Sequence, residues 1–311
     1  MKRIRHFLSI KDLSRKEIEF LIKKGLEIKK NPKRYSRKLE DKTLFMLFEA
    51  PSLRTRVSFE AGMTQLGGHA IYYSVSESTL GKKESIKDFT KSAERYCDII
   101  MARLYAHEQI EEIAANASIP VINAMSNAEH PCQILGDLMT IYEKRKTLKG
   151  RLAYLGDGFN NVTHSLLLGC AAVGMDIAVA SPAGKEYEPD RRVVAAAKSL
   201  AAKSGSSILL TSDAREAAKN AGVIYTDSWM SYRIPASQEE ERMKIFMPYQ
   251  ANAGLMKLAK AGAAFMHCLP AKRGHEVTDE VMDSRQSIVF DQAENRLHAQ
   301  KALMLRLLGK I

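Results

Sequence analysis

The sequence predicts an α/β protein with two doubly wound domains, each built on a parallel central sheet. Short apolar runs of strand length, such as the run from Thr43 to Phe48, alternate with stretches of helical character along the whole chain. With 311 residues, the chain is long enough for two such domains with sizeable cores. Because the longest apolar runs have only strand length, we expect no membrane span.

The first half of the chain is predicted to contain four strands separated by helices. The run 43–48 is nearly all apolar and short, as a buried parallel strand should be. Pro51 lies just ahead of a stretch that continues as a helix. The predicted strands span 43–48, 69–73, 98–102 and 120–123, and the predicted helices span 54–66, 84–95, 107–115 and 131–146.

The second half repeats this alternation and ends in a long helix. Lys149-Gly150 marks the break before the second sheet, so we place the domain boundary inside or just after the helix 131–146, which would serve as a hinge. The polar stretch from Tyr232 to Gln250 is too long for a plain connection, and we interpret it as a candidate lid. The predicted strands span 151–156, 175–180, 206–211, 222–227, 264–268 and 287–290, the last helix spans 292–308, and the domains are 1–146 and 147–291.

The net charge of +11 raises the question of a nucleic-acid partner. The excess is local, because residues 1–42 hold 15 Lys and Arg against 6 Asp and Glu, whereas the remainder holds 32 against 30. In the predicted helix that ends near Lys30, six apolar positions suggest one buried face, and no aromatic platform for single-stranded nucleic acid is interleaved with the charges. We therefore interpret the basic run as a solvated helix face and expect no nucleic acid as partner. The six apolar positions are Leu13, Ile18, Leu21, Ile22, Leu26 and Ile28.

The four cysteines form no Cys-x-x-Cys pair. This spacing argues for reduced thiols in the cytoplasm and against a structural zinc site. The first residues are charged and lack an apolar core, so we expect no secretory signal.

The segment Ser52-Leu53-Arg54-Thr55-Arg56 lies where a strand should end and a helix should begin. A helix N-terminus offers unpaired backbone N–H groups and the positive end of a dipole. Two hydroxyls and two guanidiniums added there would suit a phosphate or a similar dianion. The residues alone leave an alternative equally open, in which Ser52 caps the helix and both arginines are solvated.

Polar side chains recur after the predicted strands. Ligands collect outside the carboxyl ends of parallel strands, so we expect these side chains to meet in one cleft between the two sheets. Taken singly, each has an ordinary structural explanation, such as a surface cation, a helix cap, a turn residue or a core thiol. They are Ser52, Arg103 and His130 in the first domain, and Asn161, Asp227 and Cys268 in the second.

The segment from Gly156 to Asn161 follows a strand and precedes a helix, as a dinucleotide-binding loop would. However, Asn161 occupies the third glycine position, and the next predicted strand ends in Ser181-Pro182 instead of an acid for a ribose. We therefore expect no nicotinamide cofactor.

Together, three motifs resemble the aspartate/ornithine carbamoyltransferase family. They are the Ser52 to Arg56 segment, His130-Pro131-Cys132-Gln133 and His267-Cys268-Leu269-Pro270, in that order. The resemblance extends from His6 to the segment from Glu294 to Lys301, and the last motif resembles the ornithine branch. It implies that the C-terminal helix, 292–311, completes the first domain.

The resemblance also implies substrates and roles. Carbamoyl phosphate would bind in the first domain and L-ornithine in the second, with no cofactor and no metal. Direct acyl transfer would follow, with catalytic roles for Thr55, Arg103, His130 and Cys268. The implied residues for carbamoyl phosphate are Ser52, Leu53, Arg54, Thr55, Thr79, Arg103, His130, Pro131, Cys132, Gln133, Cys268, Leu269 and Arg296; those for ornithine are Asn161, Asp227, Ser231, Tyr232, Cys268 and Leu269.

The chain departs from the family pattern at several positions. Tyr232-Arg233 replaces Met-Gly in the amine-binding segment, so a related amine such as putrescine or lysine remains an alternative substrate. Leu53 stands where Thr is commoner, and Thr79 stands where Gln or His is frequent. In the family, the loop with that position reaches a neighbouring subunit's site, which implies a homotrimer or a multiple of trimers. The alternative from a different functional class is a non-catalytic protein that binds nucleic acid or has a regulatory role.

Overall fold

The computed structural model describes residues 6–77, 84–231 and 234–311. The chain divides into two compact units. The first unit comprises residues 1–144 and 294–311, and the second unit comprises residues 145–293.

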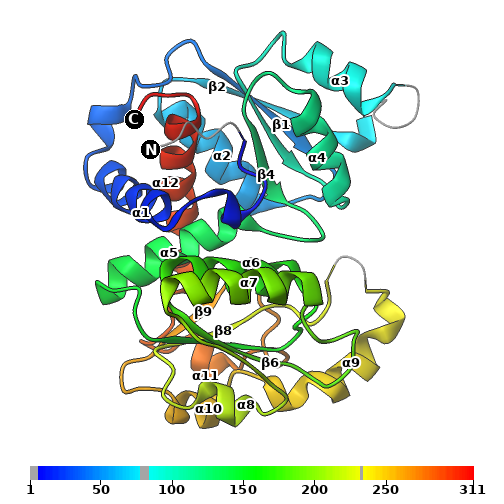
Figure 1. Cartoon of the computed structure of the whole chain (residues 1–311), viewed down its shortest axis with the longest axis vertical. Helices are drawn as coiled ribbons and strands as arrows, with labels where there is room; N and C mark the ends of the chain where they lie inside the picture. Colours follow the sequence, from blue (N-terminus) through cyan, green and yellow to red (C-terminus); the bar gives the residue numbers. More distant parts are fainter. Residues whose placement is uncertain (1–5, 78–83, 232–233) are drawn as a thin grey trace. The chain divides into compact units, whose positions relative to one another are not determined.

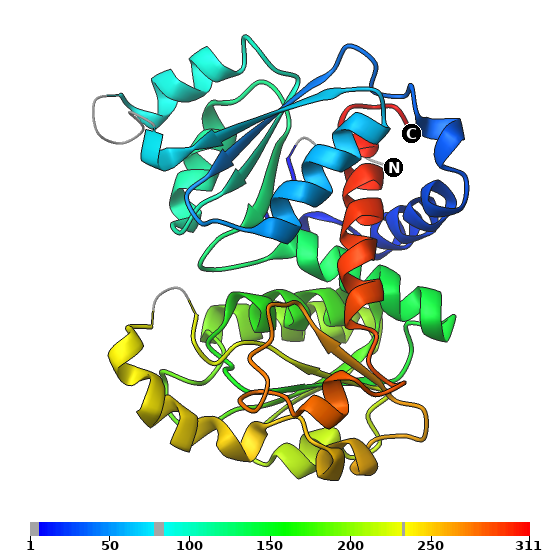
Figure 2. The same ribbon diagram turned by 180° about the vertical axis from the view of Figure 1, so that it is seen from behind.

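The first unit contains a sheet of four parallel strands in the order β2-β1-β3-β4. Two opposite views show α3 and α4 on one side of this sheet, and α2 and α12 on the other (Figures 1 and 2). The strands are β1 (Thr43–Phe48), β2 (His69–Ser74), β3 (Ile99–Arg103) and β4 (Val121–Met125). The helices are α1 (Arg15–Lys30), α2 (Leu53–Gln65), α3 (Ile86–Ala93), α4 (His107–Asn116), α5 (Pro131–Arg145) and α12 (Val289–Leu307), with short 3₁₀ helices at Ile10–Asp12, Pro32–Tyr35 and Val75–Glu77.

Helix α1 has the buried face that the apolar spacing predicts. Ser14 caps its N-terminus, and Glu17 completes a capping box. Five of the six apolar positions are buried, and Leu26 is half-buried. Part of the basic charge is neutralised locally, because Lys24 pairs with Glu27 at 2.6 Å and Lys29 pairs with Glu143 at 3.1 Å.

The second unit contains five parallel strands in the order β7-β6-β5-β8-β9. Helices α6 and α7 lie on one side of this sheet, and α8, α10 and α11 lie on the other (Figure 1). The strands are β5 (Arg151–Leu155), β6 (Asp176–Ala180), β7 (Ile208–Thr211), β8 (Val223–Thr226) and β9 (Ala264–His267). The helices are α6 (Asn161–Val173), α7 (Arg191–Ser204), α8 (Ala214–Ala218), α9 (Glu239–Phe246), α10 (Ala253–Leu258) and α11 (Asp279–Met282), with 3₁₀ helices at Ala236–Gln238 and Met247–Tyr249.

One predicted element of the second half differs from the structure. The predicted strand 287–290 is wrong, because Ser287 makes only an isolated bridge to Phe265 and α12 already begins at Val289. A short apolar run does not distinguish a strand from the start of a buried helix. The polar stretch 232–250, interpreted as a candidate lid, contains the helix α9 in its described part, and its role as a lid stays a prediction.

The strand order gives each sheet a topological switch point. In the first unit, the chain crosses from β2 on one side of β1 to β3 on the other. In the second unit, β6 and β7 extend the sheet from one side of β5, and β8 and β9 extend it from the other. Loops after neighbouring strands diverge at such points and leave room for a ligand. The segments that follow β1 and β3, and those that follow β5 and β8, are therefore the places to look for a site.

Every helix within the described ranges is too short or too polar to span a lipid bilayer.

Candidate functional site

In the first unit, three side chains from different elements meet at the hydroxyl of Thr55. Arg103 at the end of β3 approaches Thr55 Oγ1 with Nη1 at 3.4 Å, and Arg296 of α12 approaches it with Nη2 at 3.4 Å. Ser52 Oγ donates to the same oxygen at 3.2 Å. Thr55, Arg103 and Arg296 are all buried. Two guanidiniums held out of water around one neutral hydroxyl create a strongly positive site suited to a dianion.

The helix start that precedes Thr55 has the predicted cap. Ser52 is the N-cap of α2, and its Oγ accepts from the Thr55 backbone N–H at 3.3 Å. The side chain of Leu53 is exposed, so its predicted role would rest on its backbone N–H. Half-buried Arg54 forms no hydrogen bond or ion pair with the residues that the structure describes.

Arg56 does not join the positive site around Thr55, and of the two interpretations left open for this segment the solvated cation applies to Arg56. Its guanidinium lies 3.9 Å from the centroid of the Tyr72 ring, and its Nε is 3.2 Å from Glu60. An α-helix rotates by about 100° for each residue, so the side chain of Arg56 points in a different direction from that of Thr55. Arg56 is therefore a surface cation.

Arg296 is held in place by α5. Its Nη1 donates to Gln133 Oε1, and Gln133 Nε2 donates to Asp137 Oδ1 at 2.8 Å. Gly136 allows this approach, because a Cβ at that position would lie 3.1 Å from Arg296 Cδ. The Gln133 amide thus orients Arg296, a role that the sequence did not predict for it.

His130 is buried and lies within electrostatic range of the same two cations. Its pKa is well below its ordinary value because burial disfavours the charged imidazolium, and the charges of Arg296 and Arg103 act in the same direction. Its ring is therefore neutral at pH 7. The adjacent Cys132 thiol donates to the Asn123 carbonyl at 3.3 Å, and burial raises its pKa to about 12. The predicted role of Cys132 would therefore rest on its backbone.

In the second unit, Asp227 organises the residues at the ends of β5, β8 and β9. Its Oδ2 accepts from Asn160 Nδ2 at 3.0 Å, and its Oδ1 accepts from Cys268 Sγ at 2.9 Å. Asn160, the N-cap of α6, is thus the partner of Asp227, whereas Asn161 is the first residue of the helix. Leu269 adopts a left-handed conformation with φ of 61°, a strained geometry that often accompanies functional sites.

A buried ion pair supports these loops. Arg242 of α9 donates from Nη2 to Asp157 Oδ2 at 2.5 Å and from Nε to the Trp229 carbonyl at 2.7 Å. Its guanidinium also lies 4.6 Å from the Phe246 ring centroid. Burial raises the pKa of Asp157 to about 6, against the opposing effect of Arg242. One side chain therefore ties α9 to the loops that follow β5 and β8.

Ser231 borders a cavity of about 290 Å³ next to this loop. Other residues that line it are Ser228, Trp229, Met230, Ile234, Ala236, Glu239, Lys272, His275 and Glu276. The predicted site residues Thr79 and Tyr232 lie outside the described residues, as does Arg233.

Asp227, His267 and Cys268 offer potential metal ligands within 4.8 Å of one another. Cys268 Sγ donates to Asp227 Oδ1 at 2.9 Å, whereas the side chain of His267 contacts Leu269 and Glu276. His267 Nδ1 accepts from the Leu269 N–H at 2.8 Å, and its Nε2 lies 3.3 Å from Glu276 Oε1. Because the ring's lone pair is engaged with the backbone, a metal would have to displace that bond. The expectation that the chemistry needs no metal stays a prediction.

Sequence reasoning missed Asn160, Asp157 and Arg242. Asn160 carried a usable signal, since Asn is a preferred N-cap directly before a predicted helix. The partnership of Asp157 with Arg242 joins residues 85 positions apart and left no local signal.

The chain belongs to the aspartate/ornithine carbamoyltransferase family. The family's carbamoyl-P binding domain matches residues 5–143, and its Asp/Orn binding domain matches residues 149–307. The resemblance stated from the motifs is thereby confirmed.

Within this family, the chain is similar to proteins named ornithine carbamoyltransferase. It is 50% identical over 306 residues to the one from Anoxybacillus flavithermus, covering 97% of this chain and 96% of the relative. It is 53% identical over 276 residues to the one from Pyrococcus horikoshii, covering 88% and 86%. The solved ornithine carbamoyltransferase from Pyrococcus furiosus superposes with a TM-score of 0.94 at 48% identity, covering 99% of this chain and 98% of that one.

Proposed function

We propose that this chain transfers the carbamoyl group of carbamoyl phosphate to the δ-amine of L-ornithine and releases L-citrulline and inorganic phosphate. The observation that carries the proposal is the convergence of Arg103 and Arg296 on the Thr55 hydroxyl at the N-terminus of α2. The names of the relatives, at about half identity over nearly the whole chain, support the choice of ornithine.

The first unit is proposed to bind carbamoyl phosphate. The N-terminus of α2 supplies backbone N–H groups to the phosphate, and Arg54, Arg103 and Arg296 supply positive charge. A neutral His130 ring donates to the carbamoyl group without adding a further buried charge. Pro131, Cys132 and Gln133 complete this end of the site, and Gln133 does so by holding Arg296.

The second unit is proposed to bind ornithine. Asp227 and Ser231 take the α-ammonium group, Asn161 takes the α-carboxylate, and Cys268 with the Leu269 carbonyl directs the δ-amine. The carboxylate of Asp227 is already oriented by Asn160 and Cys268, so little reorganisation is needed when a cationic substrate arrives.

The chemistry is a direct acyl transfer. The neutral δ-nitrogen forms a bond to the carbamoyl carbon, the carbon–oxygen bond to phosphate breaks, and its electron pair leaves with the phosphate. A proton is lost from the nitrogen. Arg103, Thr55 and His130 stabilise the negative charge that develops on the carbonyl oxygen, as an oxyanion hole does. Each of these steps proceeds without a cofactor.

The active assembly is proposed to be a homotrimer, or a multiple of trimers, in the cytoplasm. Two apolar side chains one turn apart on α2, Leu53 and Val57, are exposed in the single chain and would be covered by a second copy. None of the four cysteines, all within the described residues, forms a disulfide, which is the pattern that a reducing compartment favours. Light scattering that gives the mass of one 34.7-kDa chain would contradict the trimer.

The test of the reaction is a colorimetric assay for the ureido product with carbamoyl phosphate and a panel of amines. We expect product with ornithine and much less with lysine or putrescine, because putrescine lacks the α-carboxylate and α-ammonium groups. Product from putrescine or lysine alone would replace ornithine as the substrate. Absence of product with every amine would contradict carbamoyl transfer altogether.

A further inference from the structure

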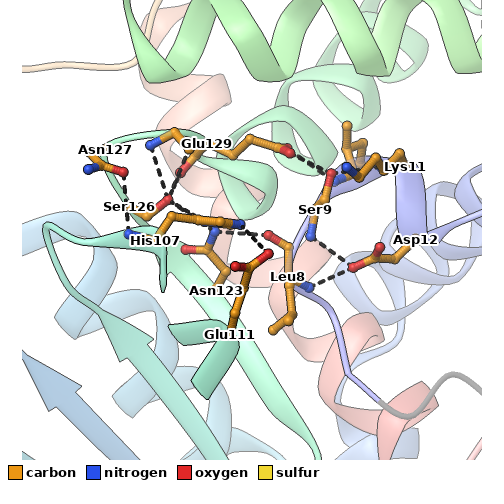
Figure 3. Close-up of polar contacts among 12 residues, drawn as sticks. Leu8, Ser9, Lys11, Asp12, His107, Glu111, Asn123, Ser126, Asn127 and Glu129 are labelled. Carbon is orange, nitrogen blue, oxygen red and sulfur yellow. Dashed lines mark hydrogen bonds and ion pairs between the residues drawn. The ribbon is translucent and has the colours of Figure 1, made fainter. Parts of the chain in front are cut away.

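The turn that precedes His130 is built around one hydroxyl. Ser126 Oγ accepts from the backbone N–H groups of Ala128 at 3.3 Å and Glu129 at 3.2 Å, and the Ser126 N–H donates to the Glu129 carbonyl at 2.8 Å. His107 Nδ1 lies 2.8 Å from the same hydroxyl (Figure 3). Residues 126–129 therefore form a closed turn whose last residue is joined directly to His130.

The N-terminal segment runs beside β4 and next to this turn. The Phe7 N–H donates to the Val121 carbonyl at 2.8 Å, and the Asn123 N–H donates to the Phe7 carbonyl at 2.8 Å. The Asn123 side chain donates to the Leu8 carbonyl at 2.9 Å. Phe7 thus forms an isolated parallel bridge to Ile122 of the edge strand β4, and Leu8 is held by the Asn123 side chain.

Glu129 connects the turn to this segment. Ser9 Oγ donates to Glu129 Oε1 at 2.5 Å (Figure 3). The Ile10 N–H approaches Glu129 Oε2 at 3.4 Å. Glu129 is 6% exposed and Ser9 is 4% exposed. A carboxylate this deeply buried depends on its donors, so its position is coupled closely to that of Ser9. The contact joins residues 120 positions apart.

His130 is therefore fixed from both sides. On the C-terminal side, its carbonyl accepts from the Gln133 N–H at 3.0 Å and the Ile134 N–H at 3.3 Å in the first turn of α5. On the N-terminal side, the Glu129 carboxylate is fastened to the N-terminal segment. Loss of the second attachment would remove the restraint that the N-terminal segment places on this turn, while the first turn of α5 stays in place.

We propose that Glu129 is a positioning residue that sets the place of the His130 ring in the positive site, with Ser9 as its anchor. The proposal rests on the proposed function, because it assigns to Glu129 an effect on carbamoyl transfer. In this proposal the N-terminal segment acts on the site indirectly: Ser9 holds the Glu129 carboxylate, and Glu129 in turn positions the adjoining His130. The effect should fall on the use of carbamoyl phosphate and leave ornithine binding unchanged.

The test is a double-mutant cycle on the full-length protein. Glu129→Gln keeps the size of the side chain but places an amide N–H₂ against a donor, so we expect kcat/KM for carbamoyl phosphate to fall about 10- to 100-fold. The KM for ornithine should stay within about twofold of the wild-type value. In the His130→Ala background, Glu129→Gln should cause little further loss, because the residue through which it acts is gone. Glu112→Gln, an exposed glutamate on α4, is the matched control and should behave as wild type.

Ser9→Ala tests the same contact in case the Glu129 variant does not fold. It removes only one oxygen atom, and it should lower kcat/KM for carbamoyl phosphate in the same direction but by less. A second readout does not depend on activity. The His130 ring resonance, assigned by its absence in His130→Ala, should move in the NMR spectra of Glu129→Gln and Ser9→Ala but not of Glu112→Gln.

The outcomes separate the two proposals. Wild-type kinetics together with an unmoved His130 resonance in Glu129→Gln would overturn the positioning role. An equal loss in the presence and absence of His130 would also overturn it, since Glu129 would then act on the fold as a whole. A wild-type protein without any carbamoyl transfer would contradict the proposed function, and the resonance shift would still decide whether Glu129 positions His130.

Discussion

The buried pair of Asp157 and Arg242 predicts an unusual dependence of stability on pH. Burial raises the pKa of Asp157 from 3.8 to about 6, so desolvation outweighs the attraction of the guanidinium. The folded state therefore binds more protons than the unfolded state between these two values. The contribution of Asp157 to the free energy of unfolding is therefore highest below pH 3.8 and falls as the pH rises through 6. A salt-bridged surface carboxylate has the opposite trend.

The perturbation is Asp157→Asn, which removes the titration and keeps the shape. The measured quantity is the free energy of unfolding of the wild type minus that of the variant. As the pH rises from below 3.8 to above 6, this difference should fall by about 3 kcal/mol, at about 1.4 kcal/mol for each pKa unit. Between pH 5 and pH 7 the expected fall is about 1 kcal/mol. Other titrating groups, such as His130 and His298, are common to both proteins and cancel in the difference.

The assay is urea unfolding at constant ionic strength, followed by tryptophan fluorescence. Trp229 is the single tryptophan of the chain, and its carbonyl accepts from Arg242 at 2.7 Å. Its buried ring stacks on Phe246, so its emission reports unfolding next to the ion pair. A difference that is flat between pH 5 and pH 7, or that rises, would refute the reasoning. Asp283→Asn is the control, because the Arg273 partner lowers the pKa of that exposed carboxylate; its difference should be flat between pH 5 and pH 7 and should change only below pH 3.8, where it rises with pH.

Three further predictions concern activity and stability. Arg103→Ala should retain the fold but lose about 10²- to 10³-fold in kcat, whereas Arg56→Ala, which removes a surface guanidinium, should stay within a few-fold of wild type in the same ureido assay. Arg242→Lys keeps the charge but loses the planar fork, so initial-rate measurements should show a several-fold higher KM for ornithine and an unchanged KM for carbamoyl phosphate. Gly174→Ala should lower the unfolding free energy by about 1 kcal/mol in urea, because the C-cap of α6 has φ of 79°; an unchanged midpoint would contradict this assignment.

The fold could be predicted from the sequence because its signals are local. Each buried parallel strand is a short apolar run, and the helices between the strands have their own length, caps and buried face. The predicted strand 287–290 was wrong because a short apolar run there does not distinguish a strand from the start of a buried helix. Ile288 and Val289 read as a strand but lie at the start of α12.

The candidate site was predictable in part for the same reason. Polar residues at strand ends pointed to Ser52, Arg103 and Asp227, since the geometry of parallel sheets brings such residues to one edge. The structure then showed that neighbouring polar residues of one segment have different surroundings. Thr55 and Arg56 are neighbours in the chain, yet Thr55 is buried against Arg103 and Arg56 lies over Tyr72.

By itself, the sequence determined the order of the strands and helices along the chain and the kinds of side chain placed at the strand ends, because these follow from residue type and short-range spacing. Only the tertiary structure decided which distant groups became partners. Ser9 reaches Glu129 across 120 positions, and Asp157 reaches Arg242 across 85. Contacts of this kind depend on how the elements pack, and no local pattern of residues encodes them.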